Sequence, residues 1–386
     1  MSLPLPNKLP YSGTSIFTQM TQLAQQNGAL NLSQGFPDFD SPPALLDALK
    51  HYASQGFQQY APMQGLMALR EQVALSAQRR YGILPDSATE IAITPGATQA
   101  IFCAIQAVIQ AGDEVIIFDP CYDSYAPATQ LAGGVAVHVP LTADFSVDWA
   151  LFEAAISSKT RLVILNFPHN PSGAIISRTD LEELARRIAD YPIFVLSDEV
   201  YEHLVFDGQH CASVLELEAL RARAFVVGSF GKTFHVTGWK IGYVIAPPAL
   251  MRAFLAIHQY VSYCASTPLQ YALADFMQQH PEHIQQLGSF YQTKRDLFAQ
   301  LMQDSAFKLL PSRSTYFQLL DYSALRPELD DVQMSHWLVQ TQGIAVIPIS
   351  VFYQKPVTGQ RLIRLCFAKT EQTLQHAAAC LTAIQD

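Results

Sequence analysis

The stretch VVGSFGKTFHVTGWKIGY (226–243) places one lysine, Lys232, directly after an apolar strand. A lysine amine becomes a nucleophile or a base only where its surroundings lower its ordinary pKa of about 10.4. The Gly-Lys-Thr tripeptide suggests a P-loop, but that motif requires a glycine at position 226, where Val226 stands. The shorter spacing from Gly228 cannot wrap a phosphate with backbone N–H groups. Lys232 therefore needs a different chemical explanation.

Polar or aromatic side chains follow three further apolar stretches, and a fourth apolar stretch leads into PGATQA (95–100). Ligands of doubly wound sheets bind outside the carboxyl ends of the strands, so we expect these residues at one edge. Each residue alone has an ordinary explanation as a turn, a helix cap, a packed ring or a surface charge. Their common position favours a shared site, whose members are Tyr122, Asn170, Asp198, Tyr201, Ser229 and Lys232.

Pyridoxal 5′-phosphate is a cofactor that needs this combination of side chains. A lysine amine reacts with its aldehyde, and a carboxylate keeps the nitrogen of its pyridine ring protonated. An aromatic side chain stacks on the ring, and hydrogen-bond donors hold its phenolic oxygen. A helix N-terminus, a hydroxyl and a cation hold the phosphate. The sequence therefore predicts a pyridoxal-phosphate site at this edge of the sheet.

The composition of the chain limits the classes of protein to which it can belong. A chain of 386 residues, 49% of them apolar, can bury a sizeable core in more than one domain. A net charge of −9 without a run of Lys and Arg argues against nucleic-acid binding. The six cysteines lack Cys-x-x-Cys spacing, which predicts reduced thiols and no metal site. We see neither a signal peptide nor an apolar stretch of about 18 residues, so we expect a cytoplasmic protein without membrane contact.

Apolar stretches that alternate with helical patterns predict an α/β fold with a mostly parallel seven-stranded sheet between layers of helices. The predicted strands are 90–94, 114–120, 135–141, 161–168, 194–199, 224–229 and 240–246. The predicted helices are 44–52, 66–81, 97–110, 282–302, 371–383 and one that runs from the cap signal Ser177-x-x-Asp180 to Ala189.

The chain divides into three predicted parts. Residues 1–43 are rich in Pro, Gly and Ser and are expected to form an irregular arm that completes the smaller domain. Residues 44–281 are expected to form the large, cofactor-binding domain. Residues 282–386 are expected to form a smaller α+β domain with two or three strands.

The sequence resembles the fold-type I, class I aminotransferases. Within them it is most similar to the branch of kynurenine, glutamine–phenylpyruvate and methionine aminotransferases, and to the methionine aminotransferases above all. The similarity spans nearly the whole chain in family order. It is carried by NLSQGFPDF (31–39), QYAPMQG (59–65), TPGATQAIF (94–102), DPCYDSY (119–125), NFPHNPSG (166–173), SDEVYEHLVFD (197–207), SFGKTFHVTGWKIGY (229–243) and RLCFAK (364–369).

This resemblance implies a role for each matching residue. Lys232 corresponds to the lysine that binds the cofactor aldehyde and moves the substrate proton, and Asp198 to the partner of the ring nitrogen. Tyr122 corresponds to the stacking aromatic. Asn170 and Tyr201 correspond to the donors to the phenolic oxygen, and the phosphate cradle corresponds to Ala97, Thr98, Ser229 and Lys240. Many relatives carry arginine at the position of Lys240, and lysine keeps the charge without the bidentate fork.

The resemblance also implies a homodimer and a substrate pocket. Tyr60 corresponds to a tyrosine that reaches the cofactor phosphate of the neighbouring subunit. Arg364, beside Gly35 and Asn170, corresponds to the residue that binds the substrate α-carboxylate. On its own, Arg364 in LIRLCF has the pattern of an edge residue with its head in water. The expected wall of the side-chain pocket is large and apolar, and consists of Ile16, Phe17, Phe36, Tyr125 and Tyr263.

The expected activity is transamination by a ping-pong mechanism. Large neutral amino acids are the expected donors: methionine, aromatic amino acids and, further, histidine or glutamine, with a 2-oxo acid as acceptor. Carbon–sulfur β-elimination on the same cofactor is the first alternative, because relatives that catalyse it share these residues. A non-catalytic pyridoxal-phosphate sensor ranks lower, because no basic helix-turn-helix segment is seen. A nicotinamide site is excluded, since no G-x-G-x-x-G follows the first strands.

Overall fold

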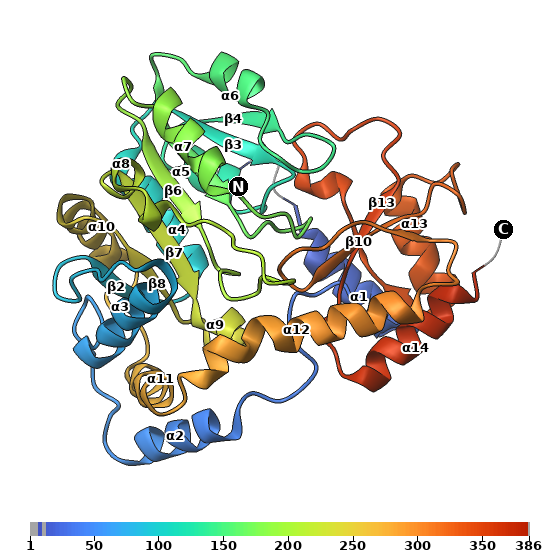
Figure 1. Cartoon of the computed structure of the whole chain (residues 1–386), viewed down its shortest axis with the longest axis horizontal. Coiled ribbons are helices and arrows are strands. Elements are labelled where there is room, and N and C mark those ends of the chain that lie inside the picture. Colours follow the sequence, from blue (N-terminus) through green and yellow to red (C-terminus); the bar gives the residue numbers. More distant parts are fainter. Residues whose placement is uncertain (1–6, 10–12, 385–386) are drawn as a thin grey trace, which may run out of the picture.

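Seven strands form the larger sheet of the molecule, which we describe from a computed structural model covering residues 7–9 and 13–384. The seven predicted strands and the mostly parallel α/β arrangement are confirmed (Figure 1). In spatial order the strands are β2 (Ile91–Thr94), β8 (Gly242–Ile245), β7 (Ala224–Ser229), β6 (Phe194–Asp198), β5 (Thr160–Asn166), β3 (Glu114–Asp119) and β4 (Val135–Pro140).

Strand β8 is the only strand of this sheet, within the described residues, that runs against the others. It pairs antiparallel with both β2 and β7, and Gly242 at its start lies opposite Thr94 and Ser229 at their ends. The residues just before β8, Lys240 among them, therefore reach the same edge as the carboxyl ends of the parallel strands. This reversal brings Lys240 to the edge at which the other polar residues gather.

Both faces of the larger sheet are buried under helices. Because side chains alternate along a strand, Leu162 and Ile164 of β5 face one helical layer, and Val163 and Leu165 face the other. One layer consists of α4 (Ala97–Val108), α5 (Tyr125–Leu131) and α10 (Pro248–Val261). The other contains α3 (Met67–Tyr81), α6 (Trp149–Ala155), α7 (Arg178–Arg187) and α11 (Thr267–Gln279).

Further elements, most of them short, complete this part of the chain. They are α2 (Pro43–Ser54), which packs on α11, η1 (Val214–Glu216), α8 (Glu218–Arg221), α9 (Phe230–Thr233) and η2 (Thr237–Trp239). The predicted cap of α7 is confirmed, because Ser177 and Asp180 form a reciprocal capping box. In the described part of the chain, no helix combines the length and the apolar character that crossing a bilayer requires.

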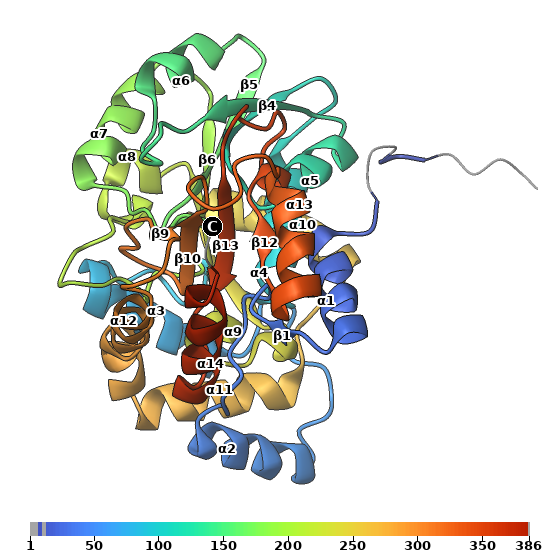
Figure 2. The same ribbon diagram turned by 90° about the vertical axis from the view of Figure 1, so that its right-hand side faces the viewer.

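A second, antiparallel sheet organises the C-terminal part of the chain (Figure 2). Its strand order is β12 (Ile347–Pro348), β13 (Leu362–Cys366), β10 (Phe317–Asp321) and β9 (Lys308–Leu309). Helix α12 (Glu282–Leu301) runs from the larger sheet to this smaller one (Figure 1). The remaining elements are α13 (Asp331–Trp337), the π-helical turn η3 (Leu338–Gln342), β11 (Ile344–Ala345), η4 (Ser350–Phe352) and α14 (Glu371–Thr382).

The prediction of an irregular arm over residues 1–43 is wrong for part of that segment. Residues Ile16–Asn27 form helix α1, and β1 (Leu30–Asn31) pairs parallel with β11. The Ser15 side chain caps the helix by accepting from the Thr18 N–H, and Gly28 ends it with a φ of 62°. Residues 1–6 and 10–12, which also belong to the predicted arm, lie outside the described residues.

Two further apolar clusters surround the smaller sheet. One joins α12, α14, β10 and β13, and the other joins α1, β11 and β12. Tyr201, Leu204 and Phe206, which follow β6, pack into the first of these clusters. Residues of the predicted large domain thus contribute to the core of the smaller sheet, and the domain boundaries at 43 and 281 stay predictions.

Candidate active site

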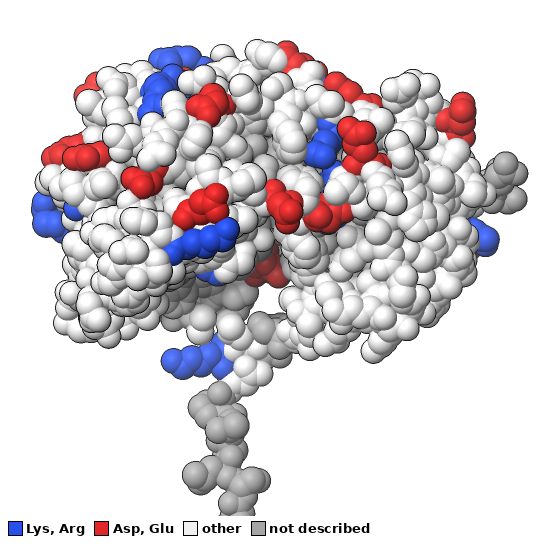
Figure 3. Space-filling model, turned by 90° about the horizontal axis from the view of Figure 1, so that it is seen from below, with Lys and Arg blue, Asp and Glu red and all other residues white. Residues whose placement is uncertain are grey.

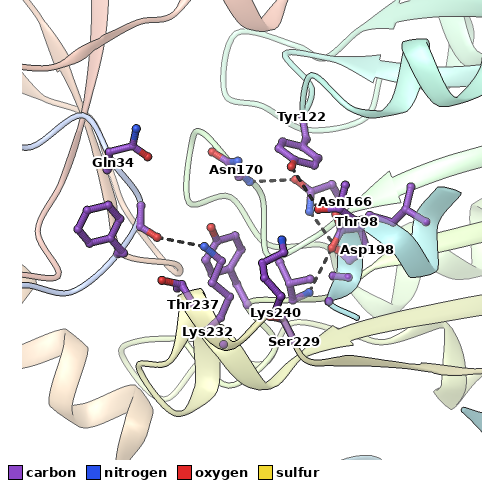
Figure 4. Close-up of a pocket in the computed structure, with 18 of the residues that line it drawn as sticks. Gln34, Thr98, Tyr122, Asn166, Asn170, Asp198, Ser229, Lys232, Thr237 and Lys240 are labelled. Carbon is purple, nitrogen blue, oxygen red and sulfur yellow. Dashed lines mark hydrogen bonds between the residues drawn. The ribbon is translucent and has the colours of Figure 1, made fainter. Parts of the chain in front are cut away.

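Three adjacent parallel strands end in polar residues: β5 in Asn166, β6 in Asp198 and β7 in Ser229. These residues line a cavity of about 390 Å³ at the carboxyl edge of the larger sheet (Figure 4). The smaller sheet contributes Phe317 and Arg364 to its wall, and the N-terminal segment contributes Phe17 and Gln34. The volume is in the range of small-molecule sites. The expectation that polar strand ends meet at one edge is therefore met.

Lys232 projects into this cavity from the short helix α9 (Figure 4). Its Nζ donates to the carbonyl oxygen of Gly35 at 3.0 Å and lies 5.6 Å from the ring centre of Tyr201. Burial lowers the pKa of Lys232 to about 8. An amine with this pKa is partly unprotonated near neutral pH, as a nucleophile or base must be.

Asp198 is 4% exposed, and none of the ion pairs among the described residues includes it. Its Oδ2 accepts from the Tyr125 hydroxyl at 2.6 Å, and its Oδ1 accepts from the Val200 N–H at 3.4 Å. Burial raises the pKa of Asp198 to about 6, while the bond from Tyr125 lowers it. At neutral pH a buried, ionised carboxylate therefore lines the cavity. A cationic N–H group in the cavity would stabilise that charge.

An anion-binding arrangement lies at the start of α4. Gly96 precedes the helix with a φ of 80°, a conformation that favours glycine. A Cβ at Gly96 would lie 3.3 Å from Cε and 3.4 Å from Nζ of Lys240, so the lysine head group reaches this point. The first N–H groups of a helix have no intrahelical partners, and its dipole is positive there. Two positive features at one place indicate a site for an anion such as phosphate.

Hydroxyl, amide and aromatic groups also line the cavity. The Tyr122 hydroxyl lies 3.4 Å from Thr98 Oγ1, and the Asn170 N–H donates to Asn166 Oδ1 at 3.2 Å. Tyr201 is 4% exposed and lies edge-on to Tyr316, with ring centres 5.2 Å apart. Rings and hydrogen-bonding groups thus face the space between Lys232 and Asp198.

Arg364 lies in β13 and is 1% exposed, so its interpretation as a solvated edge residue is wrong. Its Nη1 donates to Asn170 Oδ1 at 2.7 Å and its Nη2 to the Ser33 carbonyl at 3.0 Å. Its Nε is buried without a hydrogen-bond partner. Burial lowers the pKa of Arg364 to about 10, yet the guanidinium stays charged at neutral pH. A buried cation with only neutral partners indicates a site for a carboxylate.

Aromatic rings enclose the Arg364 head group. The guanidinium carbon lies 4.0 Å from the ring centre of Phe317, 5.2 Å from that of Phe352 and 5.4 Å from that of Phe17. Rings hold a guanidinium by cation–π attraction and exclude water from around it. The fork of Arg364 is therefore fixed in orientation before any ligand enters.

All of the predicted site residues line the cavity except Tyr60, Tyr125, Tyr263 and Ile16. Tyr60 and Tyr263 are 85% and 44% exposed, and their ring centres lie 5.7 Å apart. Ile16 begins α1 and packs against the apolar cluster of α1, β11 and β12. The predicted roles of Tyr60, Tyr263 and Ile16 stay predictions.

Tyr125, expected in the wall of the side-chain pocket, lies elsewhere. It is 1% exposed and is not among the lining residues of the cavity, because its hydroxyl donates to Asp198. Its position indicates support of the carboxylate rather than contact with a side chain of the substrate.

The sequence did not predict several of the lining residues, which are Gln34, Gly96, Ile101, Asn166, Val200, Gly231, Thr237, Ile241 and Phe317. Asn166 could have been found, because it ends a predicted strand as Asp198 does. Gln34 could not have been found by that rule, since it lies in the N-terminal segment. There its Nε2 donates to the Phe17 carbonyl and to Thr21 Oγ1.

The residues present fit pyridoxal 5′-phosphate. The unpaired carboxylate of Asp198 suits a protonated ring nitrogen, and the start of α4 with Lys240 suits the phosphate. Lys232 supplies an amine with a lowered pKa. The buried Nε of Arg364 leaves a donor for the carboxylate of an amino acid.

Comparisons of the sequence and of the structure with known proteins point to the same family. Residues 27–381 match the family described as Aminotransferase class I and II. The chain is 51% identical to methionine aminotransferase of Escherichia coli, over 96% of each chain. It is 32% identical to kynurenine–oxoglutarate transaminase 1 of Rattus norvegicus, over 94% of this chain and 93% of that one. Its structure matches that of YbdL from Escherichia coli with a TM-score of 0.96, 50% identity and coverage of 99% and 100%.

Proposed function

The chain belongs to the class I and II aminotransferases and is a transaminase, and from this premise we propose its cofactor, substrates and catalytic residues. We propose that it transfers the α-amino group of methionine and other large neutral amino acids to a 2-oxo acid. The proposed cofactor is pyridoxal 5′-phosphate. The observation that carries the proposal is the meeting of Lys232, Asp198 and Arg364 in one cavity.

We propose that four features hold the cofactor. Lys232 binds its aldehyde, Asp198 its ring nitrogen, Tyr122 its ring face, and the start of α4 with Ser229 and Lys240 its phosphate. When bound, the cofactor supplies an electron-withdrawing ring that stabilises negative charge at the substrate α-carbon. Asp198, with a pKa of about 6, is ionised at neutral pH and so keeps a proton on the ring nitrogen.

Lys232 also handles the substrate proton in this proposal. With a pKa of about 8, its Nζ can accept a proton from the α-carbon and release it again at neutral pH. Phe17 and Phe317 exclude water around Arg364, which holds the substrate carboxylate. The fixed fork of Arg364 aligns the substrate so that the α-hydrogen, rather than another substituent, points toward the base.

The proposed substrate class rests on the charge of the cavity wall. Phe17, Phe36, Ile101, Val200 and Phe317 supply its apolar part. Arg364 is the only arginine that lines the cavity among the described residues. A distal carboxylate in this wall would be desolvated without a partner, which costs several kcal/mol, about the range for buried unpaired charges. Support also comes from the substrate named for the Escherichia coli relative.

A panel of amino acids tests this proposal. Methionine, phenylalanine and aspartate are each offered with several 2-oxo acids, and formation of the new amino acid is measured. We expect kcat/KM for methionine to exceed that for aspartate by roughly 100-fold or more, from the cost of the unpaired carboxylate. Release of pyruvate and ammonia from cysteine conjugates is measured alongside. Faster elimination than transfer would favour the β-lyase alternative.

We propose a homodimer with shared sites. Support comes from the exposed rings of Tyr60 (85%) and Tyr263 (44%), whose centres lie 5.7 Å apart, and from the exposed ring of Tyr260, three residues before Tyr263 in the chain. Exposed aromatic patches are typical of protein interfaces. Analytical ultracentrifugation tests the stoichiometry. Tyr60→Phe should weaken cofactor retention if Tyr60 reaches the partner's phosphate.

The remaining proposals concern location, partners and domains. A cytoplasmic location is supported by six cysteines that are all free. Small-molecule rather than nucleic-acid partners are supported by the net charge of −9 and by one face on which Lys and Arg are interspersed with Asp and Glu (Figure 3). We propose that residues 1–43, which include α1 and β1, are an N-terminal segment that forms part of the small domain, that 44–281 are the large domain and that 282–386 are the small domain.

A further inference from the structure

A cluster of three potential metal ligands lies at the end of β3 and on the neighbouring strand β4. The ligand atoms of Asp119, Cys121 and His138 all lie within 4.8 Å of one another. None of the three residues lines the cavity. The proposed transaminase chemistry uses none of them, so the cluster needs its own explanation.

The topology of the larger sheet assembles this cluster. Asp119 ends β3, and His138 on the neighbouring β4 lies opposite Ile117. Side chains two residues apart on a strand share a face, so Asp119 and His138 point to the same side of the sheet. Cys121 follows two residues after Asp119. Their exposed fractions are low, 6% and 10% for the side chains of Asp119 and His138, and 8% for Cys121.

The donor set suits a thiophilic divalent cation. A thiolate, an imidazole and a carboxylate are the ligand types that Zn²⁺ takes in proteins, and three of them leave a fourth position for water. Donor atoms around tetrahedral Zn²⁺ lie roughly 3.5 Å apart, so the three atoms need to move by about 1 Å or less. The charges of Asp119 and an ionised Cys121 together balance a dication.

The carboxylate is already oriented by a backbone group. His138 Nδ1 lies 2.8 Å from Asp119 Oδ1, while Asp119 Oδ2 accepts from the Gln354 N–H at 2.9 Å. Hydrogen bonds that orient ligands in this way are common around metal sites. Oδ2 stays fixed by Gln354, which leaves Oδ1 as the ligand atom.

Two hydrogen bonds join the cluster to the segment after β12. The Cys121 N–H donates to the Phe352 carbonyl at 2.7 Å, and Gln354 follows two residues later. The ring of Phe352 packs 5.2 Å from the guanidinium of Arg364. A cation at the cluster would therefore hold residues 352–354 against the end of β3, next to the aromatic rings around Arg364.

We propose that Asp119, Cys121 and His138 form a binding site for Zn²⁺ or a similar thiophilic divalent cation. Binding releases the proton of the Cys121 thiol to solvent, and His138 coordinates as the neutral imidazole with its one ring proton on the nitrogen that does not face the metal. The site fastens the larger sheet to the segment 352–354. The sequence prediction of no metal site considered Cys-x-x-Cys spacing only, which this cluster does not use.

Titration of the tag-free, cofactor-loaded enzyme with Co²⁺ tests the site, because a Co²⁺–thiolate bond gives a charge-transfer absorption band. We expect one Co²⁺ per chain, displaced by Zn²⁺, and a melting temperature that rises with metal concentration. Cys121→Ser should remove the band, and His138→Gln should weaken binding by roughly 100-fold or more, so that the band appears only at correspondingly higher Co²⁺ concentration.

Cys380→Ser is the matched control, since Cys380 on α14 is half-buried and lies outside the cluster. It should keep the band and the affinity. The cofactor absorbance of each variant without metal shows whether it is folded, and if Cys121→Ser is unfolded then His138→Gln decides. A band that persists in the folded Cys121→Ser variant, or an unchanged Co²⁺ affinity in the folded His138→Gln variant, would overturn the proposal. So would the absence of Co²⁺ binding by the unaltered enzyme, which would leave a His–Asp hydrogen bond without a metal.

Discussion

The two walls of the cavity bury opposite charges in different ways. On the larger sheet, Asp198 ends a strand, and its carboxylate is supported by a tyrosine hydroxyl and a backbone N–H. On the smaller sheet, Arg364 sits in the middle of a strand among aromatic rings, with an amide oxygen and a carbonyl as partners. In both cases burial moves the pKa toward neutrality, to about 6 for Asp198 and about 10 for Arg364.

This difference suggests a division of labour. The larger sheet provides groups that can gain or lose protons near neutral pH, Lys232 and Asp198. The smaller sheet provides a permanent charge whose orientation is fixed. Chemistry is therefore expected to depend on the first wall, and substrate affinity and alignment on the second.

Removal of the Lys232 amine should have the largest effect. We expect Lys232→Ala to lose at least about 10⁴-fold in kcat, because one group serves as both cofactor ligand and base. It should still bind the cofactor through the phosphate cradle, as its absorbance will show. Lys50→Ala, at an exposed lysine paired with Asp47, is the control and should be fully active. Turnover of Lys232→Ala near that of Lys50→Ala would contradict the division between the walls.

Neutralising Asp198 should have the next largest effect. Asp198→Asn keeps the shape but removes the charge that holds a proton on the ring nitrogen. We expect a loss of about 10²- to 10³-fold in kcat with little change in KM. Asp331→Asn, at another buried aspartate, should change activity little. If Asp198→Asn mainly raised KM and left kcat unchanged, Asp198 would contribute to substrate binding. That result would contradict the assignment of substrate binding to the wall of the smaller sheet.

Asp198→Asn should also raise the free energy of unfolding of the cofactor-free protein. Because folding raises the pKa of Asp198 from 3.8 to about 6, the folded state holds the proton more tightly than the unfolded state. Stability contributed by this group is therefore lost as pH rises from about 4 to about 6. Urea unfolding should show Asp198→Asn more stable at pH 7, by up to about 3 kcal/mol. The two proteins should converge near pH 4. A constant difference across this range would rule out the carboxylate as its source.

Replacing the guanidinium group of Arg364, on the smaller sheet, should mainly raise KM. Arg364→Lys keeps the charge but loses the bidentate geometry, so we expect kcat/KM for methionine to fall roughly 10- to 100-fold. Arg295→Lys, at a partly buried arginine paired with Asp207, is the matched control. Equal losses in the two variants would show that the cost is structural rather than specific to substrate.

The smallest predicted effect concerns Tyr125. Its hydroxyl lowers the pKa of Asp198, so Tyr125→Phe should raise that pKa and move the acidic limb of the pH–rate profile to higher pH. We expect the rate near neutral pH to fall about 5-fold, which corresponds to the free energy of one hydrogen bond. Tyr322→Phe, at a buried tyrosine bonded to the Leu329 carbonyl, should leave the profile unchanged.

The two walls also differed in how far the sequence could predict them. Asp198 and Ser229 were predictable because parallel strands bring their carboxyl ends together, and apolar strands are plain in the sequence. Arg364 followed only from the family resemblance, since a single arginine in LIRLCF carries no sign of its aromatic surroundings. Helix α1 was missed although its cap signals, Ser15 and Gly28, are present. The cluster of Asp119, Cys121 and His138 depends on strand neighbours, which spacing along the chain does not reveal.

The central claim is that Lys232 carries the cofactor in the cavity between these walls. Reduction of the cofactor-loaded protein with borohydride, followed by peptide mapping, tests it most directly. We predict that the cofactor is found attached to the peptide containing Lys232 and that Lys232→Ala is not labelled. Attachment to Lys240 or any other lysine in the unaltered protein, or no attachment at all, would contradict the account.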